Sequence, residues 1–142
     1  MRNFARVLSA GLISLATIGG TYTMAGSGTA HSVIVTCEAP IGASLSVVSA
    51  VCETLTGEIN RTSPSWQAIS TPTDKAADAT MTLTLHEANN REVRGELSWT
   101  RGNKRGSSPL SGISATDAEL ELSMVTGFVA KLLQRSNWHG AL

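Results

Sequence analysis

Hydrophobic and polar positions alternate along residues 80–99, and this alternation predicts the centre of the fold. A period of two with one apolar side is typical of strands that lie on a core. A polar stretch interrupts the pattern and contains Asn89 and Asn90, which suit a turn because asparagine tolerates positive φ. We therefore predict an antiparallel hairpin. Its apolar side carries Met81, Leu83, Leu85, Val93, Leu97 and Trp99, with Gly95 among them.

The opposite side of this hairpin is polar along its whole length. If the apolar side is covered by the rest of the chain, the polar side is left for solvent or for a partner. We expect a partner face on these positions, which are Thr82, Thr84, His86, Arg94, Glu96 and Ser98.

A helical period predicts a first helix over residues 43–58, with Ser44 as its N-cap. Glycine and asparagine have low helix propensity, so we expect the helix to end near Gly57 and Asn60 to lie outside it. Its predicted buried stripe consists of Leu45, Val48, Cys52 and Leu55.

A second helix is predicted from a capping box at residues 116–119 to about Arg135. Thr116 has the hydroxyl and Glu119 the carboxylate that such a box requires. Gly127 lies in the middle of this helix and predicts a close approach to the sheet. Two apolar rows mark the buried side: Leu120, Met124, Phe128 and Leu132, and beside them Val125, Val129 and Leu133.

The remaining segments complete the fold class. We predict a central strand over residues 31–37, a short edge strand over 66–70, a turn over 101–106 and a further strand over 107–114. These elements can bury one another's apolar faces in a two-layer α+β fold. It consists of a mostly antiparallel sheet of about 4–5 strands, covered on one face by two helices.

The amino-terminal residues have the form of a secretory signal peptide. Arg2 and Arg6 precede an apolar run over residues 7–20, and small residues follow. This run is shorter than the roughly 20 apolar residues of a membrane span. We expect residues 1–30 to be removed, with cleavage after Ala30 preferred over Ala25, and an uncleaved anchor is the alternative. The mature chain, residues 31–142, is then a single domain with a flexible segment at about 60–79 and a tail at 136–142.

Two cysteines, Cys37 and Cys52, are the only ones in the chain, and both lie in its exported part. In an oxidising compartment such a pair is most simply a disulfide. One cysteine lies at the inward end of the first strand and the other on the buried stripe of the first helix. We therefore predict a bridge that ties this helix to the strand, worth about 3 kcal/mol by the chain-entropy model.

Charge and motifs exclude several functions. The mature chain has nine Lys and Arg against 11 Asp and Glu, a balance that argues against nucleic-acid binding. The basic residues at 101–105 are most simply a solvated turn. We expect no cofactor and no metal, since His31, His86 and His139 are scattered. No serine elbow, phosphate loop or C-x-x-C motif is present.

The carboxylate cluster near the hairpin consists of Glu87, Glu92 and Glu96. We interpret these glutamates as solvent-exposed charges and not as an acid–base pair. We therefore expect a small exported, non-enzymatic binding or accessory module of the cell envelope or extracellular space. Its partner would be another envelope or secreted protein, and the mature chain would not span a membrane. The alternative is a small ligand-binding protein or enzyme whose pocket lies between helices and sheet, where Gly95 opposite Gly127 would give room.

The predicted order of elements is similar to that of small accessory domains of bacterial envelope and secretion systems. Examples are the amino-terminal domain of the Tol translocation protein and the curli secretion accessory protein. The resemblance covers most of the mature chain, is one of element order only, and assigns no role to any residue.

Overall fold

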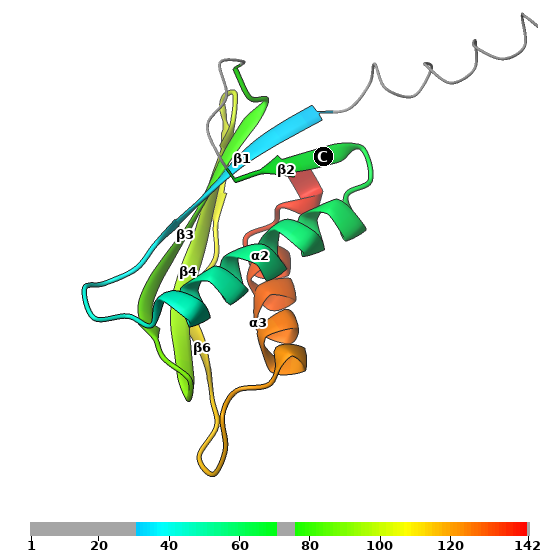
Figure 1. Cartoon of the computed structure of the whole chain (residues 1–142). Coiled ribbons are helices and arrows are strands. Elements are labelled where there is room, and N and C mark those ends of the chain that lie inside the picture. Colours follow the sequence, from blue (N-terminus) through cyan, green and yellow to red (C-terminus); the bar gives the residue numbers. More distant parts are fainter. Residues whose placement is uncertain (1–30, 71–75, 142) are drawn as a thin grey trace, which may run out of the picture. The chain divides into compact units, whose positions relative to one another are not determined.

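The computed structural model describes residues 31–70 and 76–141 (Figure 1). The predicted signal peptide lies outside the described residues, as do residues 71–75 of the predicted flexible segment and residue 142. The elements in chain order are β1 (His31–Glu38), α2 (Leu45–Thr62), β2 (Trp66–Ile69), β3 (Ala79–Ala88), β4 (Glu92–Arg101), β5 (Lys104–Ser107), β6 (Ser111–Ser114), α3 (Leu122–Arg135) and a 3₁₀ helix, η1 (His139–Ala141).

The strands form one six-stranded mixed sheet in the order β2-β1-β3-β4-β5, and β6 also pairs with β4. β1 runs parallel to both of its neighbours, β2 and β3. The pairs β3–β4, β4–β5 and β4–β6 are antiparallel. The α+β class and the mostly antiparallel sheet are thus confirmed, as are a central first strand and a short edge strand at 66–69. The sheet has six strands because the predicted strand at 107–114 is two strands.

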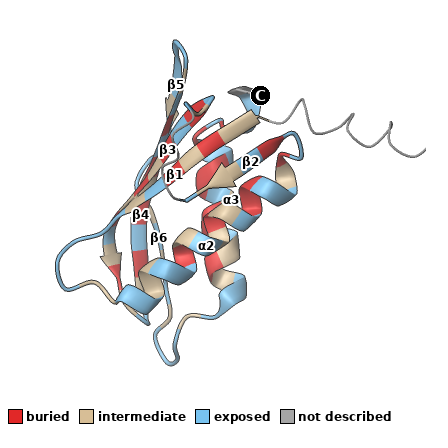
Figure 2. Cartoon of the chain, turned by 45° about the horizontal axis from the view of Figure 1, so that its top comes forward, coloured by how far each residue is buried: buried red, intermediate tan, exposed pale blue. Residues whose placement is uncertain are grey.

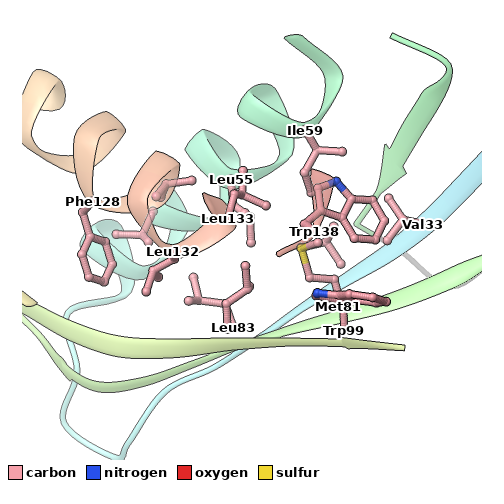
Figure 3. Packing of buried hydrophobic residues seen from close by; sticks show 14 of the residues in the cluster. Val33, Leu55, Ile59, Met81, Leu83, Trp99, Phe128, Leu132, Leu133 and Trp138 are labelled. Atoms are coloured by element: carbon pink, nitrogen blue, oxygen red, sulfur yellow. The ribbon is translucent and has the colours of Figure 1, made fainter. Parts of the chain in front are cut away.

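Both helices cover the same face of the sheet, as Figures 1 and 2 show. The predicted apolar side of the hairpin points into this layer, where Leu83 and Leu97 are fully buried and face each other in register. Figure 3 shows side chains of α2 and α3 packed against those of the sheet. The core residues from the helices are Val51, Leu55, Ile59, Val125, Phe128, Val129, Leu132 and Leu133.

The turn between β3 and β4 is confirmed, but for a different reason from the one predicted. The side-chain Oδ1 of Asn89 accepts hydrogen bonds from the backbone N–H groups of Arg91 and Glu92, both at 2.9 Å. Asn137 is the only non-glycine residue with positive φ in the described part of the chain. Asparagine therefore shapes this turn through its side chain, as in an Asx-turn, and not through a left-handed backbone.

The first helix is longer than predicted, and its buried side is different. The Ser44 hydroxyl caps it by accepting a hydrogen bond from the Val47 N–H, as predicted, yet the helix runs through Gly57 and Asn60 to Thr62. Leu45 is 83% exposed and does not belong to the buried stripe. The continuation is stabilised by packing of the last turns, where Ile59 is fully buried, and this burial outweighs the weak helix propensity of glycine.

The predictions for residues 101–114 were wrong in detail. The turn consists of Gly102 and Asn103 alone, because Lys104 already pairs with Arg101. The predicted strand at 107–114 is divided into β5 and β6, which pair with opposite halves of β4. Pro109 lies in the gap between them, and proline cannot donate a hydrogen bond to a strand ladder.

The predicted capping box does not start the second helix. α3 begins at Leu122, and its N-cap residue Glu121 makes no side-chain capping bond. Glu119 instead accepts a hydrogen bond from the Asn90 side chain at 3.3 Å, and the Leu120 N–H donates to the Asn90 carbonyl at 2.8 Å. The segment is therefore held against the β3–β4 turn and cannot coil. The predicted apolar rows from Val125 onward are buried as expected.

Residues 136–141 are not a tail. The Trp138 side chain is fully buried, with its ring centroid 5.1 Å from that of Trp66 and 5.7 Å from that of Trp99. The Trp99 Nε1–H donates to the Ser136 carbonyl at 2.9 Å, which fastens the segment to β4. The three tryptophans form one aromatic cluster, and Arg101 lies 5.0 Å over the Trp66 ring.

The predicted close approach at Gly127 is also wrong. Gly127 is exposed, and a Cβ built on it would meet nothing within 4 Å. Gly95 is a tight position instead, because a Cβ there would come within 2.6 Å of the Thr84 carbonyl oxygen on the neighbouring strand. The two glycines therefore do not open a pocket between them.

Candidate functional site

The face of the sheet opposite the helices carries every residue of the predicted partner face. Three of them, His86, Arg94 and Ser98, are exposed, and Thr82, Thr84 and Glu96 are half-buried by their neighbours. No described helix or strand packs on this face (Figure 2). The placement is as predicted, and its role as a partner surface stays a prediction.

Contacts across this face are sparse. His86 Nε2 lies 3.3 Å from Glu96 Oε1, and the Thr80 and Thr100 hydroxyls are 2.7 Å apart. His86 reaches Glu96 because the register of β3 and β4 shifts between Leu85 and Glu87. Such a bulge redirects a side chain within an otherwise regular sheet. The predicted partner face is therefore polar along both strands.

Cys37 of β1 and Cys52 of α2 form a disulfide bond, as predicted. The bond joins the last part of the strand to the middle of the helix. Both cysteines are half-buried, so the bridge lies at the border of the core. A disulfide is compatible with an oxidising compartment.

A hollow of about 490 Å³ opens beside this disulfide, between β1 and α2. We call it the β1–α2 groove. Its lining comes from three segments: Val35, Thr36 and Cys37 of β1; Cys52, Glu53 and Thr56 of α2; and Ser70 after β2. The alternative prediction expected a pocket between helices and sheet but placed it at Gly95 and Gly127, whereas this groove lies between α2 and β1. The predicted cysteine pair was one indication of this place, because it brings Glu53 and Thr56 next to β1. The extent of the groove could not be predicted because it depends on where β2 ends.

The groove borders an open edge of β1. β3 pairs with β1 over residues 33–38, but β2 pairs only over residues 31–34. The His31 N–H donates to the Ser65 carbonyl on the β2 side, and the Ser32 carbonyl accepts from the Asp78 N–H on the β3 side. Because backbone groups alternate along a strand, Cys37 directs its N–H and C=O to the β2 side, beyond the last paired residue. No described strand occupies that position.

Charge in and beside the groove is negative. Glu53 lies in the lining and Glu38 at the end of β1, and both are exposed. Neither carboxylate has a hydrogen-bond or ion-pair partner in the part of the chain that the structure describes. A cationic group entering the groove would therefore meet two uncompensated negative charges.

A structural carboxylate, Glu58, lies elsewhere on α2. Glu58 exposes only 7% of its surface, and Arg61 donates to its two oxygens at 3.0 and 2.8 Å. These hydrogen bonds lower the pKa of Glu58 and raise that of Arg61. The pair keeps a buried carboxylate ionised and near the helix end, away from the groove.

The three histidines are not brought together. His31 begins β1, where its Nδ1 lies 3.7 Å from Asp78 Oδ2, while His86 is on the open sheet face and His139 is in η1. Across residues 31–70 and 76–141, no group of three or more His, Cys, Asp or Glu side chains could hold a metal ion. Over the same residues, neither helix is long and apolar enough to cross a membrane.

Comparisons with known proteins show a similarity of fold and no match to a family. No family model matches the chain, and no curated protein matches its sequence. A crystal structure of a PelC variant from Paraburkholderia phytofirmans, a dodecamer, is 10% identical, with 75% of this chain and 88% of PelC covered and a TM-score of 0.52. At this identity the likeness shows a shared fold alone.

Two further solved structures resemble the chain more weakly. A second PelC dodecamer from the same organism is 12% identical, covers 75% of this chain and 87% of its own, and has a TM-score of 0.48. An uncharacterised protein is also 12% identical, with 78% and 90% covered and a TM-score of 0.46. Neither value supports a functional argument.

Proposed function

We propose that this chain is an exported, non-enzymatic binding module that takes an extended segment of a partner polypeptide into the β1–α2 groove. The observation that carries the proposal is that, among the described residues, β1 pairs over residues 35–38 with β3 alone and lies there beside a hollow. The polar face of the sheet is a second contact surface for the same partner.

Export is supported by two independent features. Residues 1–30 have a basic start, a short apolar run and a small-residue end, the pattern of a secretory signal peptide. The Cys37–Cys52 disulfide is of the kind that persists in exported proteins and is rare in the cytosol. The partner is then a protein of the envelope or the extracellular space.

An extended segment suits this edge because unpaired strand edges bind polypeptides by adding a strand. Main-chain hydrogen bonds supply affinity, and pockets for alternate side chains supply selectivity. Here the backbone groups of Cys37 provide the hydrogen bonds, and the groove provides the pocket. The incoming segment would continue the line of β2, which ends opposite Ile34.

The chemistry of the groove defines the segment further. Val35 and the disulfide give it an apolar floor, whereas Glu53 and Glu38 place negative charge at its rim. A segment with an apolar side chain directed into the groove and a Lys or Arg beside it complements both features. Acidic segments are disfavoured because they would bring like charges together.

The test is a selection from displayed random segments of about ten residues, the upper end of ordinary strand lengths. Segments are selected on the disulfide-bonded protein and then measured against two variants. Thr56→Trp fills the groove. Thr54→Trp is the matched control, because both threonines are half-buried on α2 and both donate to the carbonyl four residues earlier.

We expect the selected segments to be rich in Lys or Arg and to alternate in polarity. Thr56→Trp should weaken their binding at least about tenfold, or about 1.4 kcal/mol, and Thr54→Trp should not. Equal binding to both variants, or no enriched segment, would contradict the proposal. Export is tested separately from binding. If the chain is recovered in the cytosol with residues 1–30 attached, the export part of the proposal is wrong and the binding part is unaffected.

A further inference from the structure

We propose that copies of this chain associate head to tail, through two ends of the domain that carry opposite charge. This inference goes beyond the proposed function, because it concerns a second copy of the chain and surfaces away from the β1–α2 groove. It rests on how the sheet and helices distribute charged and exposed apolar side chains.

One end of the domain is basic. Lys104 and Arg105 lie on β5, next to the last residues of β4, and Arg135 ends α3, which is held to β4 by the Trp99–Ser136 hydrogen bond. These three residues are exposed, and none has a hydrogen-bond or ion-pair partner in the described structure. Together we call them the basic end. The nearby carboxylates are Glu58, which is paired with Arg61, and Asp78, which accepts a hydrogen bond from the Ser32 N–H.

The other end is acidic. Hydrogen bonds hold the segment before α3 against the β3–β4 turn, from Leu120 to Asn90 and from Ala115 to Arg91. This arrangement gathers five carboxylates, which we call the acidic end: Glu87, Glu92, Asp117, Glu119 and Glu121. Two cations lie near it: Arg91, whose guanidinium donates to the Thr116 carbonyl at 3.2 Å, and Arg94, which is paired in register with Glu87. The two ends lie at opposite ends of β4, as its register with β5 and β6 requires.

The shapes of the two ends are complementary as well. Both helices begin at the acidic end, where Leu45 is 83% and Leu122 is 70% exposed, and Ile41 in the loop before α2 is fully exposed. The basic end has a hollow of about 310 Å³ lined by the Trp99 ring and by Gly106, Ser136 and Gly140, with Lys104 and Arg105 beside it. In the proposed contact, exposed apolar side chains of the acidic end of one copy meet the hollow beside Lys104 and Arg105 on another.

Like charges disfavour contact between two identical ends, so a symmetric dimer through either end is not expected. A contact between different ends is heterologous, and repetition of it produces a ring if the rotation closes or a filament if it does not. Either product supports the proposal.

The test measures mass by analytical ultracentrifugation on the full chain, expressed from its complete coding sequence. At about 0.01 M salt, where charges are felt over roughly 30 Å, we expect the weight-average mass to be at least about twice that of one copy. At about 1 M salt, where the range is roughly 3 Å, it should fall to one copy. A wild-type protein that is monomeric at low salt would overturn the proposal.

Charge reversal makes the test specific. Lys104→Glu with Arg105→Glu, or Glu119→Lys with Glu121→Lys, should each leave the protein monomeric at low salt. Adding Arg135→Glu and Asp117→Lys to these four changes makes the former basic end negative and the former acidic end positive at the wild-type net charge, so this six-change chain should assemble. Circular dichroism checks that each variant is folded. Assembly that survives either single-end reversal, or that fails to return in a folded six-change chain, would refute the head-to-tail contact.

A second measurement needs no variant. Equal amounts of ¹⁴N- and ¹⁵N-labelled wild-type protein are mixed and treated with a carbodiimide, which joins amines to carboxylates. We expect isotopically mixed crosslinks between Lys104 and carboxylates of the acidic end. Crosslinks of Lys104 that occur only within one copy would contradict the proposed contact.

Discussion

Truncation of Trp138 tests whether the last described segment belongs to the core. The side chain is fully buried and makes edge-to-face contacts with Trp66 and Trp99. Loss of a buried tryptophan to alanine costs about 3–5 kcal/mol, because transfer free energy is lost and a cavity is left. A domain of this size has a total stability of roughly 5–15 kcal/mol, so Trp138→Ala should remove a large share of it.

Trp138→Phe gives a graded comparison. The Trp138 Nε1–H is buried without a hydrogen-bond partner among the described residues. An unsatisfied buried donor costs about 1–3 kcal/mol, so its removal offsets much of the area lost with the smaller ring. We therefore expect Trp138→Phe to cost about 1 kcal/mol, well below the cost of alanine.

Urea unfolding followed by far-ultraviolet circular dichroism measures both changes, since tryptophan fluorescence would change with the substitution itself. The midpoint should shift while the slope with urea stays the same. Gln134→Ala, at an exposed position of α3, is the control. If Trp138→Ala cost less than about 1 kcal/mol, residues 136–141 would not be part of the core, and the assignment would be wrong.

Two further predictions concern covalent and ionic links of α2. Cys37→Ser with Cys52→Ser should lower the free energy of unfolding by about 3 kcal/mol, measured in urea without reductant, and an unchanged midpoint would contradict the role of the bridge. The Glu58 pKa is lowered in the folded state, so the stability it contributes is present above the unfolded pKa of about 4.3 and is lost as pH falls through the folded value. Acid titration of stability should therefore be shallower for Glu58→Gln than for wild type, and parallel curves would count against the Arg61 pairing.

Periodic segments could be predicted from the sequence because each residue there follows one local rule. Along 80–99 every second side chain meets the core, so the pattern identifies both strands and their inward side. The same reasoning found the buried rows of α3. The bridge of Cys37 with Cys52 followed from placing each cysteine on the inward side of its own element.

Other features depend on contacts that no local pattern records. Thr116 and Glu119 match the capping-box pattern, yet the Glu119 carboxylate accepts a hydrogen bond from Asn90, a residue 29 positions earlier. Trp138 is a single aromatic residue in a short segment and has no period to reveal its burial. The β1–α2 groove exists because β2 is shorter than β3, which is a matter of strand pairing and not of composition.

The position of β1 bears on where the predicted signal peptide would be removed. His31 already donates to the Ser65 carbonyl, and the next residue, Ser32, is bound through its N–H to the Asp78 carboxylate at 2.8 Å. A protease that cut after His31 would remove the pairing of His31 with Trp66 of β2. A peptidase acting on the folded domain should therefore stop at Ala30, whatever its own sequence preference.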